Sequence, residues 1–247
     1  MNRPRLPDSP FWVEPLAVGP SHVRLSAEES HHLIHVHRAK EGTPFQATDG
    51  QGGFFECVLE SVERRAVVGR IVERRDGWGE LPRAIHLLVG LPDWTAVEAV
   101  IEHGVPLGAC VFDFVVCERS GHEGPGTARL ARLERVARAG LKQSRRSRLP
   151  RIQSSRSVRA AVQALPPGQR FVADPEGEPF TWGLEENAQA PVQIAIGPPG
   201  SFTSEERELL RDAGFSPISL GPSRLTTETA GIAILSLLRN SLLRSKL

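Results

Sequence analysis

Beyond residue 83, short apolar runs alternate along the chain with segments of helical periodicity. The apolar runs predict β-strands over residues 84–90, 109–118, 170–174, 192–197 and 215–221. The periodic segments predict helices over residues 93–103, 128–146 and 204–213, and a closing apolar helix from about Thr227. Thr203 and Glu206 have the spacing of an N-terminal capping box for the third of these helices. Strands that alternate with helices favour an α/β domain with a mainly parallel sheet.

The first 75 residues follow a different pattern. Short segments rich in β-formers, such as "GGFFECVLESV" and "AVVGRIVERR", are separated by turn signals, and one helical stretch, "SAEESHHLIHVHRAK", interrupts them. This spacing predicts a small β-barrel or a barrel-like module. The segment "RRDGWGELPR" has charge, Gly and Pro in place of periodicity and predicts a linker. We therefore expect a domain over 1–75, a linker over 76–83 and a second domain over 84–247.

Composition and charge exclude several classes of protein. The net charge is only +1, and the three cysteines form no CxxC pair, which argues against a disulfide framework or a zinc ribbon and suits a reducing cytoplasm. The N-terminus has no apolar signal segment, and polar residues interrupt the last apolar helix. We expect a cytoplasmic protein without a membrane partner.

The distribution of charge is more informative than its total. Nine cations lie between residues 129 and 151 with a single acid, Glu134, among them. Steps of three and four place the first six on one broad helical face, where like charges repel one another. A polyanion relieves that repulsion, so the pattern favours nucleic acid over a merely solvated face.

Two glycine-containing loops are candidates for a ligand pocket. "IAIGPPGSFTSEE" and "LGPSRLTTETAG" each follow a predicted strand, and the carboxyl ends of neighbouring strands are where open α/β sheets bind ligands. Neither loop has the spacing of a Walker A loop or of a dinucleotide-binding fingerprint. Together the two loops indicate a pocket for a small molecule, and the missing dinucleotide fingerprint disfavours a nucleotide-binding oxidoreductase.

The histidines of "SHHLIHVHR" raise the question of a metal site. His31 and His35 are one helical turn apart, but zinc needs further ligands and the nearest cysteine, Cys57, is isolated. Surface or packing histidines are the better interpretation, and we expect no metal. A Ser-His-Asp triad lacks the support of a GxSxG elbow.

Taken in order, these motifs resemble one family along nearly the whole chain, the RsmE-type rRNA methyltransferases of the SPOUT superfamily. "HHLIHVHRAKEGTPFQATDGQGG" is similar to the pattern in that family's PUA-like barrel, "VIEHGV" to its TELGV segment and "VVCERS" to its TERS segment. "KQSRRSRLPRI" is similar to EQS-x-R…P-x-I, "IAIGPPGSFTSEE" to IGPEGGFS-x-x-E, and "SLGPSRLTTETA" to LG-x-RILRTETA.

The resemblance implies a fold, a cofactor and a reaction. It implies a PUA-like β-barrel that binds RNA, followed by a SPOUT-type α/β domain with a deep trefoil knot, in a homodimer. It implies that the knot loops bind S-adenosyl-L-methionine and that the enzyme methylates uracil N3 in the decoding region of 16S rRNA in the small ribosomal subunit. No metal is required.

The resemblance also assigns roles to residues. The residues expected to bind the cofactor are Gly197, Pro198, Gly200, Leu220, Gly221, Leu225, Thr229 and Ala230. The residues expected to act in catalysis are Arg224, Glu228 and Arg146. The residues expected to bind RNA are Arg38, Arg135, Arg138, Lys142, Gln143 and Arg145.

This chain departs from the family pattern at several positions. An ungapped match places Ser223 and Arg224 where the family has Arg and Ile, whereas a one-residue shift aligns Arg224 with the first arginine of that motif. GPEGG becomes GPPGS, so Pro199 replaces the glutamate and Ser201 the second glycine, and Thr226 replaces the arginine before TETA. Pro199 removes a carboxylate and a backbone donor. These changes motivate an alternative hypothesis, a paralogue that binds RNA and S-adenosylmethionine without the usual activity or that methylates another nucleotide.

Overall fold

The computed structural model describes residues 9–179 and 189–244, and within them the chain forms two compact units. The first unit comprises the chain up to Glu80 together with Arg138–Leu149, and the second comprises Leu81–Ala137 and the chain from Pro150 onward. The boundaries expected from the sequence follow chain order, so they do not include this return of residues 138–149 to the first unit. Those boundaries stay a prediction.

The first unit contains a five-stranded sheet in the order β1-β3-β4-β5-β2. Its apolar core includes Phe11, Phe45 and Phe55, each no more than 2% exposed. A short α-helix continues directly into a π-helix, which carries the histidine-rich stretch. The elements are β1 (Phe11–Trp12), η1 (Pro15–Ala17), β2 (His22–Arg24), α1 (Ala27–His31), η2 (His32–Val36), β3 (Pro44–Thr48), β4 (Gly53–Glu63) and β5 (Ala66–Asp76). Because β5 runs to Asp76, the segment interpreted as a linker begins inside a strand.

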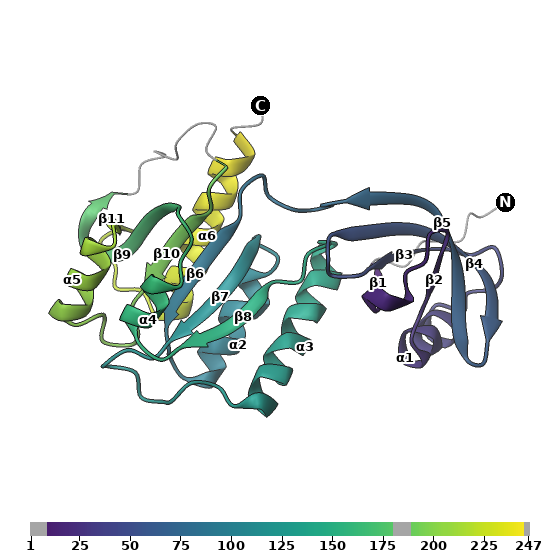
Figure 1. The fold of residues 1–247 in the computed structure, drawn as a ribbon, viewed down its shortest axis with the longest axis horizontal. Coiled ribbons are helices and arrows are strands. Elements are labelled where there is room, and N and C mark those ends of the chain that lie inside the picture. The colour runs from purple at the N-terminus through teal and green to yellow at the C-terminus, as the bar shows by residue number, and fades with distance from the viewer. Residues whose placement is uncertain (1–8, 180–188, 245–247) are drawn as a thin grey trace. The chain divides into compact units, whose positions relative to one another are not determined.

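The second unit contains a six-stranded sheet in the order β11-β9-β10-β6-β7-β8, and every pair of neighbours is parallel (Figure 1). Its strands are β6 (Ile85–Gly90), β7 (Ala109–Val115), β8 (Arg151–Ser155), β9 (Gln169–Pro179), β10 (Val192–Ile196) and β11 (Ser216–Ser219). Its helices are α2 (Trp94–Gly104), α3 (Thr127–Ser144, whose last residues belong to the first unit), α4 (Val158–Gln163), α5 (Ser204–Asp212) and α6 (Thr227–Arg244). The expected α/β domain with a mainly parallel sheet is confirmed. The trefoil knot stays a prediction.

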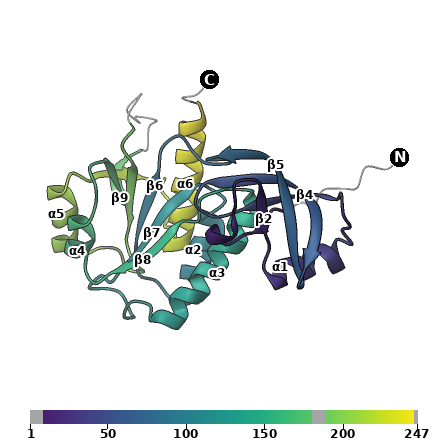
Figure 2. The same cartoon turned by 45° about the vertical axis from the view of Figure 1, so that its right-hand side comes forward.

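Helices cover both faces of this sheet. On one face, α2 and α6 pack together, and Gly104 lets α2 approach Phe112 of β7 and Leu235 of α6 closely. On the other face, α4 and α5 lie beside each other in both views and bury Val158, Ala161 and Leu210 (Figures 1 and 2). Burial on both faces explains why β6 and β10 are almost continuously apolar.

The predicted strands and helices of this unit form, with shifts at their ends, and two further elements appear. The sequence pattern predicts neither β8 nor α4, because β8 is an edge strand with two serines and α4 has only six residues. The basic helix ends at Ser144, two residues before the expected end, and Arg145 has a left-handed φ of +57°. Among residues 9–179 and 189–244, no helix has both the length and the apolar character needed to cross a bilayer.

Candidate functional site

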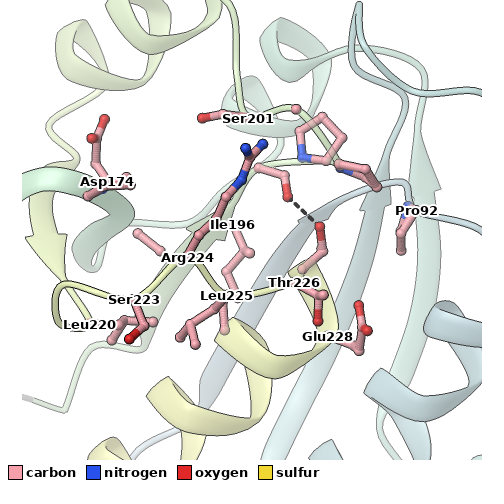
Figure 3. A pocket seen from close by; sticks show the side chains of 18 of the residues that line it. Pro92, Asp174, Ile196, Ser201, Leu220, Ser223, Arg224, Leu225, Thr226 and Glu228 are labelled. Atoms are coloured by element: carbon pink, nitrogen blue, oxygen red, sulfur yellow. Dashed lines mark hydrogen bonds between the residues drawn. The ribbon is translucent and has the colours of Figure 1, made fainter.

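A cavity of about 820 Å³ lies at the carboxyl edge of the parallel sheet in the second unit. Four segments form most of its wall: residues 92–93 after β6, 173–176 within β9, 196–201 after β10 and 220–228 after β11 (Figure 3). Because these strands are parallel, the loops that leave them meet at one edge. Both glycine-containing loops therefore line the same cavity, as the sequence analysis expected.

The loop after β10 approaches neighbouring backbone very closely. A Cβ at Gly90 would overlap the backbone nitrogen of Pro198, and a Cβ at Gly197 would lie 3.1 Å from the nitrogen of Phe202. Gly200 has a φ of +97°, a conformation that side chains rarely adopt. Glycine at these positions lets the main chain itself form the cavity wall.

Ser201, one of the departures from the family pattern, also has a left-handed backbone, with a φ of +66°. Holding a non-glycine residue in this conformation costs roughly 1–2 kcal/mol. Glycine avoids this cost, but its greater conformational freedom in the unfolded chain cancels part of the gain in stability. We therefore expect Ser201→Gly to stabilise the protein by about 0.5–1 kcal/mol and to raise its Tm by about 1–4 °C in differential scanning calorimetry.

Ser204→Gly is the matched control, since Ser204 is the exposed first residue of α5. Glycine within a helix weakens it, so this variant is expected to be no more stable than the parent protein. An unchanged or lower Tm for Ser201→Gly would contradict the idea that its backbone is strained.

Hydrogen bonds join the cavity loops to their neighbours. Thr203 and Glu206 form the predicted capping box of α5, and Glu206 Oε1 also accepts the backbone N–H of Glu118 at 2.9 Å. Arg119 Nη1 donates to the Gly200 carbonyl at 2.6 Å, and Thr227 Oγ1 donates to the Gly197 carbonyl at 2.9 Å. The "VVCERS" segment thus holds the loop after β10, a role that the spacing of the sequence motifs did not reveal.

Six charged side chains line the cavity. Arg224 extends from the segment after β11 toward Ser201 (Figure 3) and makes no hydrogen bond or ion pair with any residue that the structure describes. The second guanidinium belongs to Arg207 of α5. The four carboxylates belong to Asp93, Asp174, Glu176 and Glu228. Sequence reasoning missed Arg207, Asp93, Asp174 and Glu176 because none of them belongs to a recognised motif.

The structure brings together most of the residues expected to bind the cofactor. Seven of the eight line the cavity: Gly197, Pro198, Gly200, Leu220, Gly221, Leu225 and Ala230. Thr229 does not line it, and the Thr229 hydroxyl, in the first turn of α6, lies 2.9 Å from that of Thr226, the residue before the helix. Of the residues expected to act in catalysis, Arg224 and Glu228 line the cavity and Arg146 does not. The roles of all these residues stay predictions.

The surroundings of Arg146 indicate a structural role for it. Arg146 is 1% exposed and belongs to the first unit, where its Nη2 lies 2.6 Å from Glu80 Oε2. Glu80 Oε1 also accepts the backbone N–H groups of Ser147 and Arg148. Arg146 lies two residues beyond the end of the helix, after the left-handed Arg145. The expectation that it faces the nucleotide or the dimer partner stays a prediction.

Tertiary contacts pair three of the nine cations between residues 129 and 151 with acids. Arg132 pairs with Glu98, Arg138 with Glu14 and Lys142 with Glu29, and Arg145 donates to Gln46. These acidic partners lie outside the helix, so the scarcity of acids within it does not leave all of its cations unpaired. Arg38, Arg135 and Gln143 are exposed and make no hydrogen bond, ion pair or ring contact with any described residue.

The histidines of the "SHHLIHVHR" stretch lie on the first unit. The His31 and His35 rings are 4.4 Å apart, and Phe11 contacts His32 and His37 edge-on. Within the described residues, no three or more His, Cys, Asp or Glu side chains form a group that could hold a metal ion.

Two of the three cysteines are buried thiols. Burial raises the pKa of Cys57 to about 12, and burial together with nearby Glu206 raises the pKa of Cys117 to about 12. Because the thiolate is the nucleophile, we expect both to resist iodoacetamide at pH 8 and the partly exposed Cys110 to react first. Peptide mass mapping after timed alkylation measures this, and early labelling of Cys57 or Cys117 in the folded protein would contradict it.

The arrangement defines a class of protein: a parallel α/β domain that binds a small molecule between the loops at its carboxyl edge. The RNA methyltransferase domain family matches residues 79–239, and the RNA methyltransferase PUA domain matches residues 25–72. The chain belongs to the RNA methyltransferase family, and the resemblance to its RsmE-type members is confirmed.

Two curated relatives match most of the chain. The ribosomal RNA small subunit methyltransferase E of Synechocystis is 28% identical over 94% of this chain and 77% of its own length. The Bacillus subtilis protein of the same name is 27% identical over 86% of this chain and 87% of its own.

Solved structures share the fold. The ribosomal RNA small subunit methyltransferase E of Neisseria gonorrhoeae, bound to S-adenosyl methionine, has a TM-score of 0.82 at 22% identity and covers 94% of this chain and 97% of its own. A probable rRNA-methyltransferase from Porphyromonas gingivalis also has a TM-score of 0.82, at 26% identity, and covers 96% of this chain and 99% of its own.

Proposed function

We propose that this protein transfers a methyl group from S-adenosylmethionine to uracil N3 in the 16S rRNA of the small ribosomal subunit. The observation that carries the proposal is the cavity, whose wall combines both glycine-containing loops with Arg224, a cation that makes no hydrogen bond or ion pair with a described residue. Family membership and the names of the relatives support the RNA substrate and the reaction class.

The residues of the cavity fit this cofactor. Its volume of about 820 Å³ is in the range of pockets for ligands of this size. Ile196, Leu220, Leu225 and Ala230 offer apolar contacts to an adenine ring, and the backbone of the loop after β10 offers polar groups at close range. The adjacent carboxylates suit a ligand that carries a cationic sulfur and an ammonium group.

The chain's own residues supply position and charge. The cavity loops would hold S-adenosylmethionine, which would supply an electrophilic methyl group on its sulfonium and leave as the neutral thioether. The cavity loops hold donor and acceptor in line, which lowers the entropic part of the barrier. Uracil N3 must lose its proton to water as solvent base, and Arg224 stabilises the resulting anion by its charge. Glu228, in the first turn of α6, faces the same reaction space.

The proposal includes the cellular setting and partners. The protein acts on rRNA in the cytoplasm as a homodimer and needs no metal ion. The RNA contacts are assigned first to Arg38, Arg135 and Gln143, since these exposed side chains have no protein partner among the described residues.

Arg135 and Arg132 offer a direct comparison on one helix. Arg135→Ala is expected to reduce the salt dependence of RNA binding by about one unit of log K per log salt, because one phosphate contact is lost. Arg132→Ala is expected to change it less, since Arg132 already pairs with Glu98. Fluorescence anisotropy of a labelled rRNA fragment across a salt series measures both slopes, and equal slopes would contradict this assignment.

One specific observation favours a second candidate function. Pro199 and Thr226, which replace the family's glutamate and arginine, both line the cavity. A paralogue that binds RNA and the cofactor without methylating the usual uridine would have lost such charged groups.

Mass mapping of rRNA separates the two candidates. The rRNA of a deletion strain is compared with that of the same strain complemented with this chain. We expect one N3-methyluracil to disappear on deletion and to return on complementation. Its presence in both strains, with S-adenosylhomocysteine still binding in calorimetry, would favour the paralogue.

A further inference from the structure

Two carboxylates of β9 line the cavity beside the glycine-containing loops. Asp174 and Glu176 flank Pro175 within this strand, and Asp174 Oδ1 accepts the backbone N–H of Glu176 at 3.0 Å. Neither side chain is in an ion pair with any residue that the structure describes. Their negative charge is therefore directed at solvent and at whatever enters the cavity.

The other two carboxylates of the cavity differ in their surroundings. Asp93 caps α2 by accepting the backbone N–H groups of Thr95 and Ala96, and Glu228 lies in the first turn of α6. A helix N-terminus carries about half a positive charge, which offsets part of each carboxylate. Asp174 and Glu176 lie on a strand and have no such offset.

The cavity as a whole is electronegative. Four carboxylates face two guanidinium groups, those of Arg207 and Arg224, which leaves a formal charge of −2 on the lining side chains. S-adenosylmethionine has a net charge of +1 because its ammonium and carboxylate cancel and its sulfonium remains. The demethylated product, S-adenosylhomocysteine, is neutral.

We propose that Asp174 and Glu176 make the cavity selective for the cationic methyl donor over its neutral product. The proposal rests on the proposed function, since it assigns a task to two residues of the same site. Methyl transfer removes one positive charge from the cavity, so the attraction to these carboxylates weakens at the moment of reaction. The residues thereby favour donor binding and product release.

The expected selectivity is modest because both side chains are partly or fully exposed. Charges that face solvent interact through a high effective dielectric, so we expect a preference on the order of threefold to tenfold at low salt. Salt screens the effect, and the preference should shrink as ionic strength rises toward about 1 M, where the Debye length is about 3 Å.

Isothermal titration calorimetry of the full chain tests the proposal with three probes. They are S-adenosylmethionine, S-adenosylhomocysteine and sinefungin, an analogue that carries an amine in place of the methylated sulfur. We expect the two cationic probes to bind several-fold more tightly than S-adenosylhomocysteine. In the Asp174→Asn/Glu176→Gln double variant, the affinities for the cationic probes should fall toward that for S-adenosylhomocysteine, whose affinity should change little.

Glu178→Gln is the matched control. Glu178 is an exposed carboxylate of the same strand that does not line the cavity, so its removal should leave the affinity ratio unchanged. The Asp174→Asn change keeps the Oδ1 acceptor for the Glu176 N–H, which limits structural damage. Circular dichroism and Tm verify folding of each variant.

The outcomes separate this proposal from the proposed function. Equal affinities for all three probes in the parent protein, or a ratio that the double variant leaves unchanged, would overturn the charge selectivity while cofactor binding stands. No binding of any probe would instead overturn the proposed function.

Discussion

Arg224→Ala is expected to lower the single-turnover rate of methyl transfer by about a hundredfold or more, with cofactor affinity changed by no more than about threefold. The Arg224 guanidinium lines the cavity and has no partner among the described residues, so its charge is available to the reacting uracil. A group that stabilises charge only as the reaction proceeds affects the rate more than binding.

The measurement is a rapid-quench assay with saturating RNA and labelled cofactor, combined with calorimetric Kd values. Arg224→Lys keeps the charge but not the planar fork of donors, so it should recover part of the rate. Arg211→Ala in the last turn of α5, which does not line the cavity, is the control. An undiminished rate for Arg224→Ala would remove Arg224 from the mechanism.

Glu80→Ala is expected to destabilise the protein by about 3–5 kcal/mol, because it takes the carboxylate away from a buried guanidinium. Glu80 accepts hydrogen bonds from Arg146 Nε and Nη2 and from the backbone of Ser147 and Arg148. Its side chain is 10% exposed and that of Arg146 is 2% exposed, so water does not replace the lost contacts.

Chemical unfolding with urea, monitored by circular dichroism, measures this loss. Glu63→Ala is the control, since Glu63 pairs with Arg24 on the surface and its loss is expected to cost no more than about 1 kcal/mol. Glu80→Gln keeps a hydrogen-bond acceptor without the charge, so its loss of stability should lie between those of Glu80→Ala and Glu63→Ala. A loss of about 1 kcal/mol or less for Glu80→Ala would show that the pair does not stabilise this region.

The local sequence pattern was sufficient to predict those elements of the second unit that have a clear hydrophobic or capping pattern. The apolar runs of β6 and β10 and the Thr203–Glu206 capping box depend on residues within a few positions of one another, so the sequence predicted them correctly. The edge strand β8 and the short helix α4 lack such signals. They form because the sheet offers them a neighbour and an apolar surface.

The candidate site was also predicted from the sequence only in part. Spacing of the motifs predicted which loops form the cavity, because parallel strands bring their carboxyl ends to one edge. Motif spacing did not predict that Asp174, Glu176 and Arg207 line the cavity. Their position depends on the paths that β9 and α5 take past the two loops.

The sequence by itself determined the α/β class, the family and the two loops of the cavity, because periodicity and motif order are local properties of the chain. Only the tertiary structure determined which charged side chains are paired, which are buried and which have no partner. It paired Arg132, Arg138 and Lys142 with distant glutamates and buried Arg146 against Glu80, while Arg224 stayed without a partner among the described residues. The physical reason is that the free energy of a charge depends on its neighbours in space and its exposure to water, and neither is encoded within a short window of sequence.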